Sequence, residues 1–127
     1  MIALAGIRIL DLSRLAPGPF GSMMLADMGA EVIKIEEVAE RGGMARDIFI
    51  PPSASPEQEA RALSLDILGR NKKSIALNLK LPEGKKILYK LAATADVFYE
   101  GYRPGVTKRL GIDYETISKI NPRIIYC

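Results

Sequence analysis

The sequence predicts an α/β fold in which a Rossmann-like, mostly parallel sheet carries helices on both faces. Short apolar, β-rich runs alternate with segments of helical periodicity along the chain, and this alternation is typical of βαβ units. Glycine and proline mark the junctions between these segments. The 127 residues suffice for one domain. Because they end on an apolar run that resembles a buried strand, we expect the domain to be incomplete.

The first predicted βαβ unit opens the chain. Residues 7–12 and 31–36 are apolar and β-rich, and they predict its two strands. Between them, a turn over residues 15–20 leads into a helix that begins near Pro19 and ends at Gly29. Phe20, Met23, Met24 and Met28 recur at helical spacing, and Leu25 and Ala26 widen the buried stripe that they predict. The turn lacks the G-x-G-x-x-G spacing, so a dinucleotide-binding fingerprint is absent.

The middle of the chain predicts a long loop, a helix and a strand. Residues 37–56 contain Gly-Gly, Pro-Pro and Ser-Pro pairs, which are typical of turns and loops. Ser55 then caps a helix that runs to about residue 65. In residues 75–79, apolar residues alternate with small or polar ones, and this alternation predicts a strand.

The last third of the chain predicts three helices and two strands, and the second of these helices is short. Residues 82–92 form the clearest helix, and residues 96–99 predict the strand after it. Pro104 opens a short helix that Gly111 ends, and Asp113 caps the last helix, which a final strand follows. Two apolar stripes are predicted to be buried: Ile87, Leu88 and Leu91 in the first helix, and Tyr114, Ile117 and Ile120 in the last.

Composition and charge exclude several classes of protein. Apolar residues make up 48% of the chain and charged residues 26%, an ordinary balance for a soluble domain. The net charge of +3 is too small to argue for nucleic acid, and the sparse aromatic residues do not form a stacking platform. No apolar run reaches the roughly 20 residues of a membrane span. The amino terminus lacks the basic region of a signal peptide, so a cytoplasmic location is expected.

The side-chain types present exclude several kinds of catalytic and metal site. The chain has no histidine, and its one cysteine is Cys127. This composition excludes a Ser-His-Asp triad, a Cys-His pair or a histidine-based metal site built wholly from these residues, and we expect no metal. The slight basic excess fits an anionic small molecule as partner.

Two basic corners are candidate anion sites. One follows the strand of residues 96–99 and consists of Gly101, Tyr102, Arg103 and Arg109. There the start of a helix would offer free N–H groups, and the arginines would offer charge. The other, Gly69, Arg70, Asn71 and Lys72, precedes the strand of residues 75–79 and could cradle a phosphate. The alternative for both is an ordinary turn with solvated basic side chains.

Several blocks of the sequence, in the same order, resemble the N-terminal part of the family III CoA-transferases. These blocks are residues 6–13, 15–19, 25–36, 70–74, 95–97 and 103–106. The family includes formyl-CoA transferase, the carnitine and bile-acid CoA-transferases and the α-methylacyl-CoA racemases. The resemblance implies a Rossmann-like domain that binds coenzyme A (CoA), in a homodimer of two interlocked subunits.

The resemblance also implies CoA contacts at three places. Leu15 and Ala16 would lie beside the CoA. Gly69, Arg70, Asn71 and Lys72 match a segment that contacts the CoA nucleotide. Gly101, Tyr102, Arg103 and Arg109 match a group near the adenine and phosphates. We expect these corners to converge on one pocket rim. The chain departs from the family at Glu37, where an Arg is frequent, and Arg41 or Arg46 could supply the missing cation.

Three activities stay open at this stage. The first is CoA transfer between carboxylic acids, with an acyl-CoA and a carboxylic acid as substrates. The second is 2-methylacyl-CoA racemisation, because residues 15–19 and 100–105 resemble the racemase branch, whereas the insertion over residues 37–68 resembles the transferases. The third is a non-catalytic CoA-binding module or fragment. The resemblance implies that the catalytic residues lie beyond Cys127, so we assign none within this chain.

Overall fold

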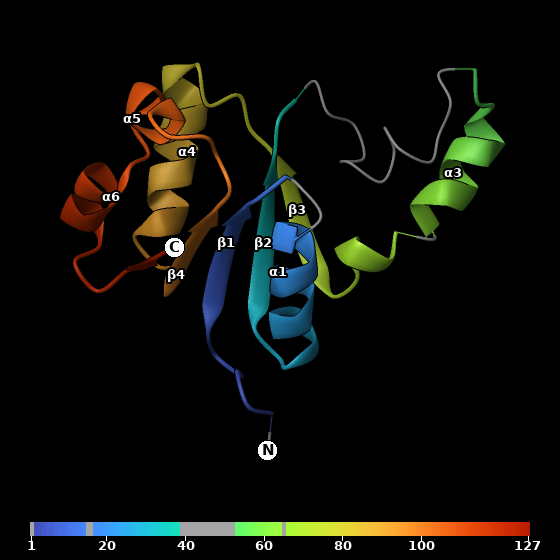
Figure 1. The fold of residues 1–127 in the computed structure, drawn as a ribbon, viewed down its shortest axis with the longest axis horizontal. Helices are drawn as coiled ribbons and strands as arrows, with labels where there is room; N and C mark the ends of the chain where they lie inside the picture. The colour runs from blue at the N-terminus through green and yellow to red at the C-terminus, as the bar shows by residue number, and fades with distance from the viewer. Residues whose placement is uncertain (1, 15–16, 39–52, 65) are drawn as a thin grey trace.

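A computed structural model describes residues 2–14, 17–38, 53–64 and 66–127 (Figure 1). Within this described part, five strands form one parallel sheet: β1 (Arg8–Leu12), β2 (Glu31–Glu36), β3 (Lys72–Ala76), β4 (Val97–Glu100) and β5 (Ile125–Tyr126). The described helices are α1 (Pro17–Asp27), α3 (Pro56–Ser64), the 3₁₀ helix η1 (Ile67–Gly69), α4 (Pro82–Ala92), α5 (Val106–Leu110) and α6 (Tyr114–Ile120).

The strand order is β3-β2-β1-β4-β5, and every neighbouring pair is parallel. The chain first builds the sheet in one direction from β1 and then returns to add β4 and β5 on the other side. This order is that of a doubly wound Rossmann-like sheet, whose topological switch point lies between β1 and β4. The predicted fold class is therefore confirmed.

Helices cover both faces of the sheet. On one face, α1 buries Ala26 against Ile9 and Val32. On the other face, α4 and α6 bury Leu88 and Ile117 in the larger core cluster. Figure 1 shows α1 on one side of the sheet, α4, α5 and α6 gathered on the other, and α3 standing away from both. The alternation of side chains along each strand supplies the two faces.

The predicted buried stripe of α1 is wrong at three of its six positions, whereas Met23 and Ala26 are buried and Leu25 is partly buried. Phe20, Met24 and Met28 are each about half exposed. The inner face of α1 consists instead of Pro19, Ser22, Met23 and Ala26. The cause is Ser22, a polar residue that faces inward because its hydroxyl bonds to a carboxylate beneath the helix. Apolar spacing alone therefore identified Met23 and Ala26 but missed Pro19 and Ser22.

Other predicted bounds hold or shift in ways that have physical reasons. The bounds of β2 and α4 agree with the prediction. β3 begins at Lys72 because the ladder to β2 starts there, and it ends before Leu77 and Leu79, which remain buried. Gly105, at φ 82°, precedes α5, so Pro104 lies outside that helix. Ile87 and Tyr114, predicted to be buried, are exposed.

The predicted helix caps are confirmed. The Ser55 hydroxyl accepts a hydrogen bond from the Gln58 N–H at 3.3 Å, and the Gln58 side chain accepts one from the Ser55 N–H at 2.9 Å. This reciprocal pair is a capping box at the start of α3. The Asp113 carboxylate likewise accepts a hydrogen bond from the Thr116 N–H at 3.1 Å, at the start of α6.

Candidate functional site

A cavity of about 550 Å³ lies at the carboxyl end of the sheet. Its walls come from residues that follow β1, β2, β3 and β4 and from α5. In open parallel sheets this edge, near the topological switch point, is where ligands bind. The volume is typical of a small-molecule site. The floor is apolar: Ile35, Leu77, Leu79, Val106 and Leu110.

The rim of the cavity carries more positive than negative charge. Four cationic side chains line it: Arg14, Lys80, Arg103 and Arg109. The two carboxylates on the rim are Glu36 and Glu37. The Glu36 carboxylate is paired with Lys34 at 3.2 Å. An anionic ligand would therefore meet arginine forks over an apolar floor.

Glu37 is paired with two of those cations. Its carboxylate accepts a hydrogen bond from the Arg14 guanidinium, and Lys80 Nζ lies 3.7 Å from its other oxygen. The hydrogen bond from Arg14 is the main reason why the pKa of the Glu37 carboxyl lies below its ordinary value. Glu37 is thus a paired carboxylate, whose charge Arg14 and Lys80 partly offset.

Tyr102 forms one wall of the cavity. Its ring packs against the main core cluster, and the Arg14 guanidinium lies 5.7 Å from the ring centroid in cation–π geometry. Its backbone N–H donates a hydrogen bond to Glu100 Oε2 at 2.6 Å. The wall therefore combines an aromatic ring from the end of β4 with a guanidinium from the end of β1.

The structure brings the first predicted group together. Gly101, Tyr102, Arg103 and Arg109 all line the cavity. Arg109 lies within α5, a helix of five residues without a side-chain cap, and the other three residues precede that helix. The arginine side chains bring positive charge to this corner, and the contribution expected from the helix start stays a prediction.

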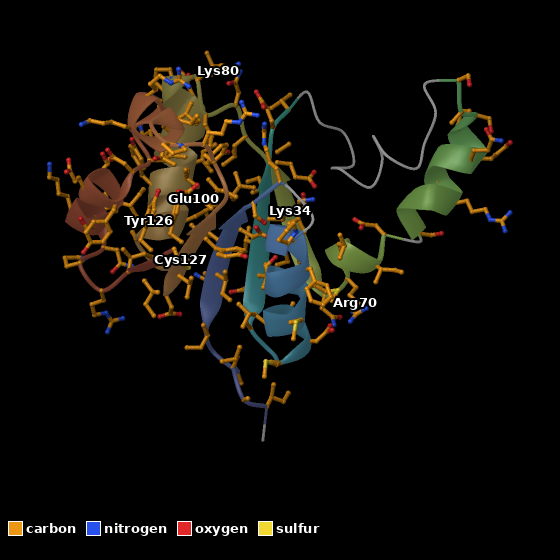
Figure 2. All side chains as sticks on the ribbon, in the orientation of Figure 1. Lys34, Arg70, Lys80, Glu100, Tyr126 and Cys127 are labelled. Carbon is orange, nitrogen blue, oxygen red and sulfur yellow. The ribbon has the colours of Figure 1, made fainter. Side chains whose placement is uncertain are left out.

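The second predicted group lies elsewhere. Arg70 donates to both carboxylate oxygens of Asp27, at distances from 2.5 to 3.1 Å, and Asn71 donates to the same carboxylate at 2.8 Å. The Gly69 N–H donates to Asp66 Oδ1 at 3.2 Å. These residues precede β3, so they lie at the amino edge of a parallel sheet, opposite the cavity. Figure 2 shows Arg70 and Lys80 at opposite ends of the sheet.

Lys72, the last member of that group, is buried. Its side chain is 2% exposed, and Nζ is paired with Asp11 at 3.2 Å beneath α1. The expectation that both basic corners share one pocket rim is therefore wrong for residues 69–72. Leu15, Ala16, Arg41 and Arg46 lie outside the described residues.

Sequence reasoning missed part of the cavity lining. Arg14 follows β1 by two residues, so the rule that the carboxyl ends of parallel strands share one edge could have selected it. No signal in the sequence singles out Lys80. Elsewhere in the described part of the chain, no group of three or more His, Cys, Asp or Glu residues could hold a metal ion. No described helix has the length and apolar character needed to cross a membrane.

Fold and cavity together define an α/β protein of the doubly wound type, with a cavity of mainly cationic rim at the carboxyl end of its sheet. A family model described as CoA-transferase family III matches residues 4–127. The chain belongs to CoA-transferase family III, as its sequence blocks suggested.

Named relatives agree with this assignment. Succinyl-CoA:glutarate CoA-transferase is 49% identical to the chain in Mus musculus and 48% in Homo sapiens. These matches cover 100% and 98% of this chain but 28% and 27% of the relatives. The alpha-methylacyl-CoA racemase of Homo sapiens is 37% identical over 98% of this chain and 27% of its own length. The chain therefore spans somewhat more than a quarter of these relatives.

A solved structure, that of Rv3272 from M. tuberculosis, has the same fold. It superposes with a TM-score of 0.81 at 34% identity, over 99% of this chain and 32% of that one. The prediction of an incomplete Rossmann-like domain agrees with this partial coverage.

Proposed function

We propose that the protein carrying these residues transfers CoA between carboxylic acids and that the cavity binds the nucleotide end of CoA. The observation that carries the proposal is the cavity itself, with four cationic side chains and Tyr102 around an apolar floor. CoA bears a pyrophosphate, a 3′-phosphate and an adenine. Phosphates call for guanidinium and ammonium donors, and a base calls for an aromatic or apolar surface.

Roles follow from position on the cavity wall. Arg103 and Arg109 would bind the phosphates, and Tyr102 with the apolar floor would hold the adenine. Arg14, which lies over the Tyr102 ring, would contribute a further phosphate contact. The catalytic carboxylate is expected beyond Cys127. The contacts predicted for Leu15, Ala16, Gly69, Arg70, Asn71 and Lys72, the interlocked homodimer and the cytoplasmic location remain predictions.

The relatives suggest the substrate class. The two at 48% and 49% identity are named for succinyl-CoA and glutarate, so a dicarboxylic acyl-CoA donor and a dicarboxylate acceptor are the first choice. Racemisation is the second candidate, since the racemase relative is 37% identical. Glutaryl-CoA formed from succinyl-CoA and glutarate, detected by mass spectrometry, would support transfer. Deuterium uptake at the α-carbon of a 2-methylacyl-CoA without transfer would support racemisation.

Binding of CoA is tested separately, by titration calorimetry with Arg103→Ala and Arg109→Ala. Each arginine contributes charge-assisted hydrogen bonds, so each change should weaken CoA binding about tenfold. Arg123→Ala is the matched control, because Arg123 is exposed and does not line the cavity. Unchanged affinity in both cavity variants would remove the site. Binding by the protein without turnover of either substrate pair would leave only a CoA-binding module.

A further inference from the structure

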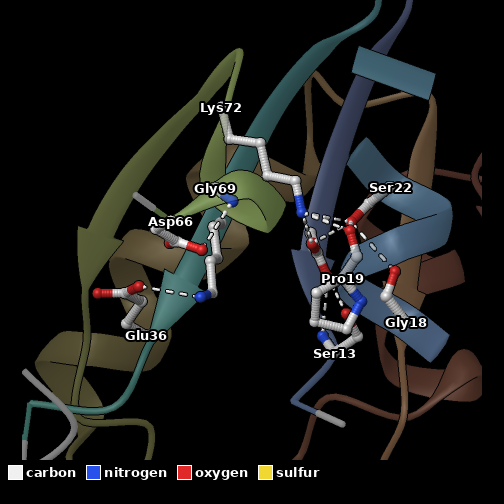
Figure 3. Close-up of polar contacts among 10 residues, drawn as sticks. Ser13, Gly18, Pro19, Ser22, Glu36, Asp66, Gly69 and Lys72 are labelled. Carbon is white, nitrogen blue, oxygen red and sulfur yellow. Dashed lines mark hydrogen bonds and ion pairs between the residues drawn. The ribbon is translucent and has the colours of Figure 1, made fainter. Parts of the chain in front are cut away.

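Lys72 uses its entire hydrogen-bonding capacity inside the protein. It begins β3, and its side chain runs beneath α1 with 2% exposure. Its Nζ donates to Ser22 Oγ at 2.8 Å, to the Pro19 carbonyl at 3.0 Å and to Asp11 Oδ2 at 3.2 Å (Figure 3). An ammonium group has three donors, and three acceptors surround this one. Lys72 therefore has no donor left for a phosphate in this arrangement.

Asp11 is the centre of the same network. Its carboxylate is fully buried. Oδ1 accepts hydrogen bonds from the Ser13 N–H at 2.9 Å and from the Ser13 hydroxyl at 2.5 Å. Oδ2 accepts from the Ser22 hydroxyl at 2.5 Å as well as from Lys72. Four donors thus satisfy a carboxylate that would otherwise be costly to bury.

The network fixes both ends of the connection between β1 and α1. Ser13 is the first residue of that connection, and Ser22 is the sixth residue of α1. Gly18 packs against Ser13 so closely that an added Cβ would lie 2.3 Å from the Ser13 Cβ. Lys72 joins this corner to β3, two strands away in the sheet. A charged pair between elements so far apart in sequence specifies their relative position more than it adds stability.

We propose that Lys72 is a positioning residue for the ligand site: it acts through Asp11 to hold the corner between β1 and α1, and does not bind phosphate itself. This inference rests on the proposed function. Arg14, which lines the cavity, is the residue next to Ser13. A shift of the corner would therefore displace a cavity cation, and small displacements of binding groups are costly.

The two possible roles of Lys72 predict opposite effects for Asp11. If Lys72 and Asp11 act on the ligand as charges, Lys72→Met should weaken CoA binding and Asp11→Asn should strengthen it. If they act through the corner, both changes should weaken CoA binding by a similar factor, about tenfold. The double variant should then be no weaker than either single one, because both break the same network.

The experiment measures CoA affinity by calorimetry at several salt concentrations for wild type, Lys72→Met, Asp11→Asn and the double variant. A positioning role leaves the salt dependence of Lys72→Met equal to that of wild type, whereas a lost phosphate contact reduces it. Ser22→Ala, which unpairs no charge, gives a milder break of the same network should a charge variant not fold. Weaker binding by Ser22→Ala supports the proposal.

Stronger binding by Asp11→Asn, or a reduced salt dependence in Lys72→Met, overturns the proposal. Wild-type protein that binds no CoA overturns the proposed function instead. The network is then judged by urea unfolding alone. If the double variant loses less unfolding free energy than the two single variants lose together, the coupling is supported. If the losses are additive, the coupling is overturned.

Discussion

Glu37 lies on the cavity rim between two cations, and its charge opposes that of any phosphate bound there. Glu37→Gln removes this charge while leaving Arg14 and Lys80 in place. CoA affinity should therefore rise, by about threefold at low salt, because a like charge several ångströms away acts through a high effective dielectric. Calorimetry at two salt concentrations measures this gain, which should shrink as salt rises. Glu115→Gln, at an exposed position of α6, is the control. A loss of affinity in Glu37→Gln would mean that Glu37 orients Arg14.

Tyr126 should make the protein sensitive to alkaline pH. Its ring stacks on Phe98 with centroids 5.1 Å apart, and its hydroxyl donates to the Ile112 carbonyl at 3.0 Å. Burial raises the pKa of Tyr126 to about 12. A raised folded-state pKa means that the stabilisation is complete below the unfolded value, near 10, and is lost as pH rises toward 12. Urea unfolding between pH 9 and 11.5 should show this decline, and Tyr126→Phe should show a smaller one; equal slopes would contradict it.

At the scale of elements, α4 contains a glycine where helix propensity would favour alanine. Gly84 is buried, and an added Cβ would lie 2.2 Å from the Asn78 carbonyl oxygen. Propensity alone gives Gly84→Ala a gain of about 1 kcal/mol. Overpacking against backbone costs about 1–3 kcal/mol and should prevail, so the variant should be less stable. Urea unfolding tests the sign, with Lys86→Ala, exposed on the same helix, as the control expected to change little.

Helices and strands were predictable where one face is apolar without interruption. The bounds of β2 and α4 follow from local periodicity, since their inner faces carry apolar residues or glycine. The buried face of α1 and the bounds of β3 were not predictable, for a common reason. Ser22 and Lys72 face inward because both contact Asp11. From the sequence pattern, a polar residue on a buried face is predicted to be exposed unless its buried partner is known. That partner lies 61 residues from Lys72 in the chain.

At the scale of the whole molecule, the direction of the strands decides which basic corner can line the cavity. All five described strands are parallel, so residues that follow a strand and residues that precede one lie at opposite edges. Gly101 to Arg109 follow β4, whereas Gly69 to Asn71 precede β3. With the correct bounds of β3, the sequence alone would have separated the group that follows β4 from the group that precedes β3. The same rule places Arg14, which follows β1, on the cavity side, whereas Lys80 was identified only from the folded structure.

The two edges of the sheet give the last prediction. Arg70 is exposed and paired with Asp27 at the amino edge, whereas Arg109 lines the cavity at the carboxyl edge. If the cavity alone binds the CoA phosphates, Arg70→Ala should leave CoA affinity within about twofold of wild type, since an exposed ion pair contributes little to stability and less to a distant site. Arg109→Ala should weaken CoA binding about tenfold and reduce its salt dependence. Equal losses in the two variants would mean that CoA reaches the amino edge, and that the segment of residues 69–72 contacts the nucleotide as the family resemblance implies.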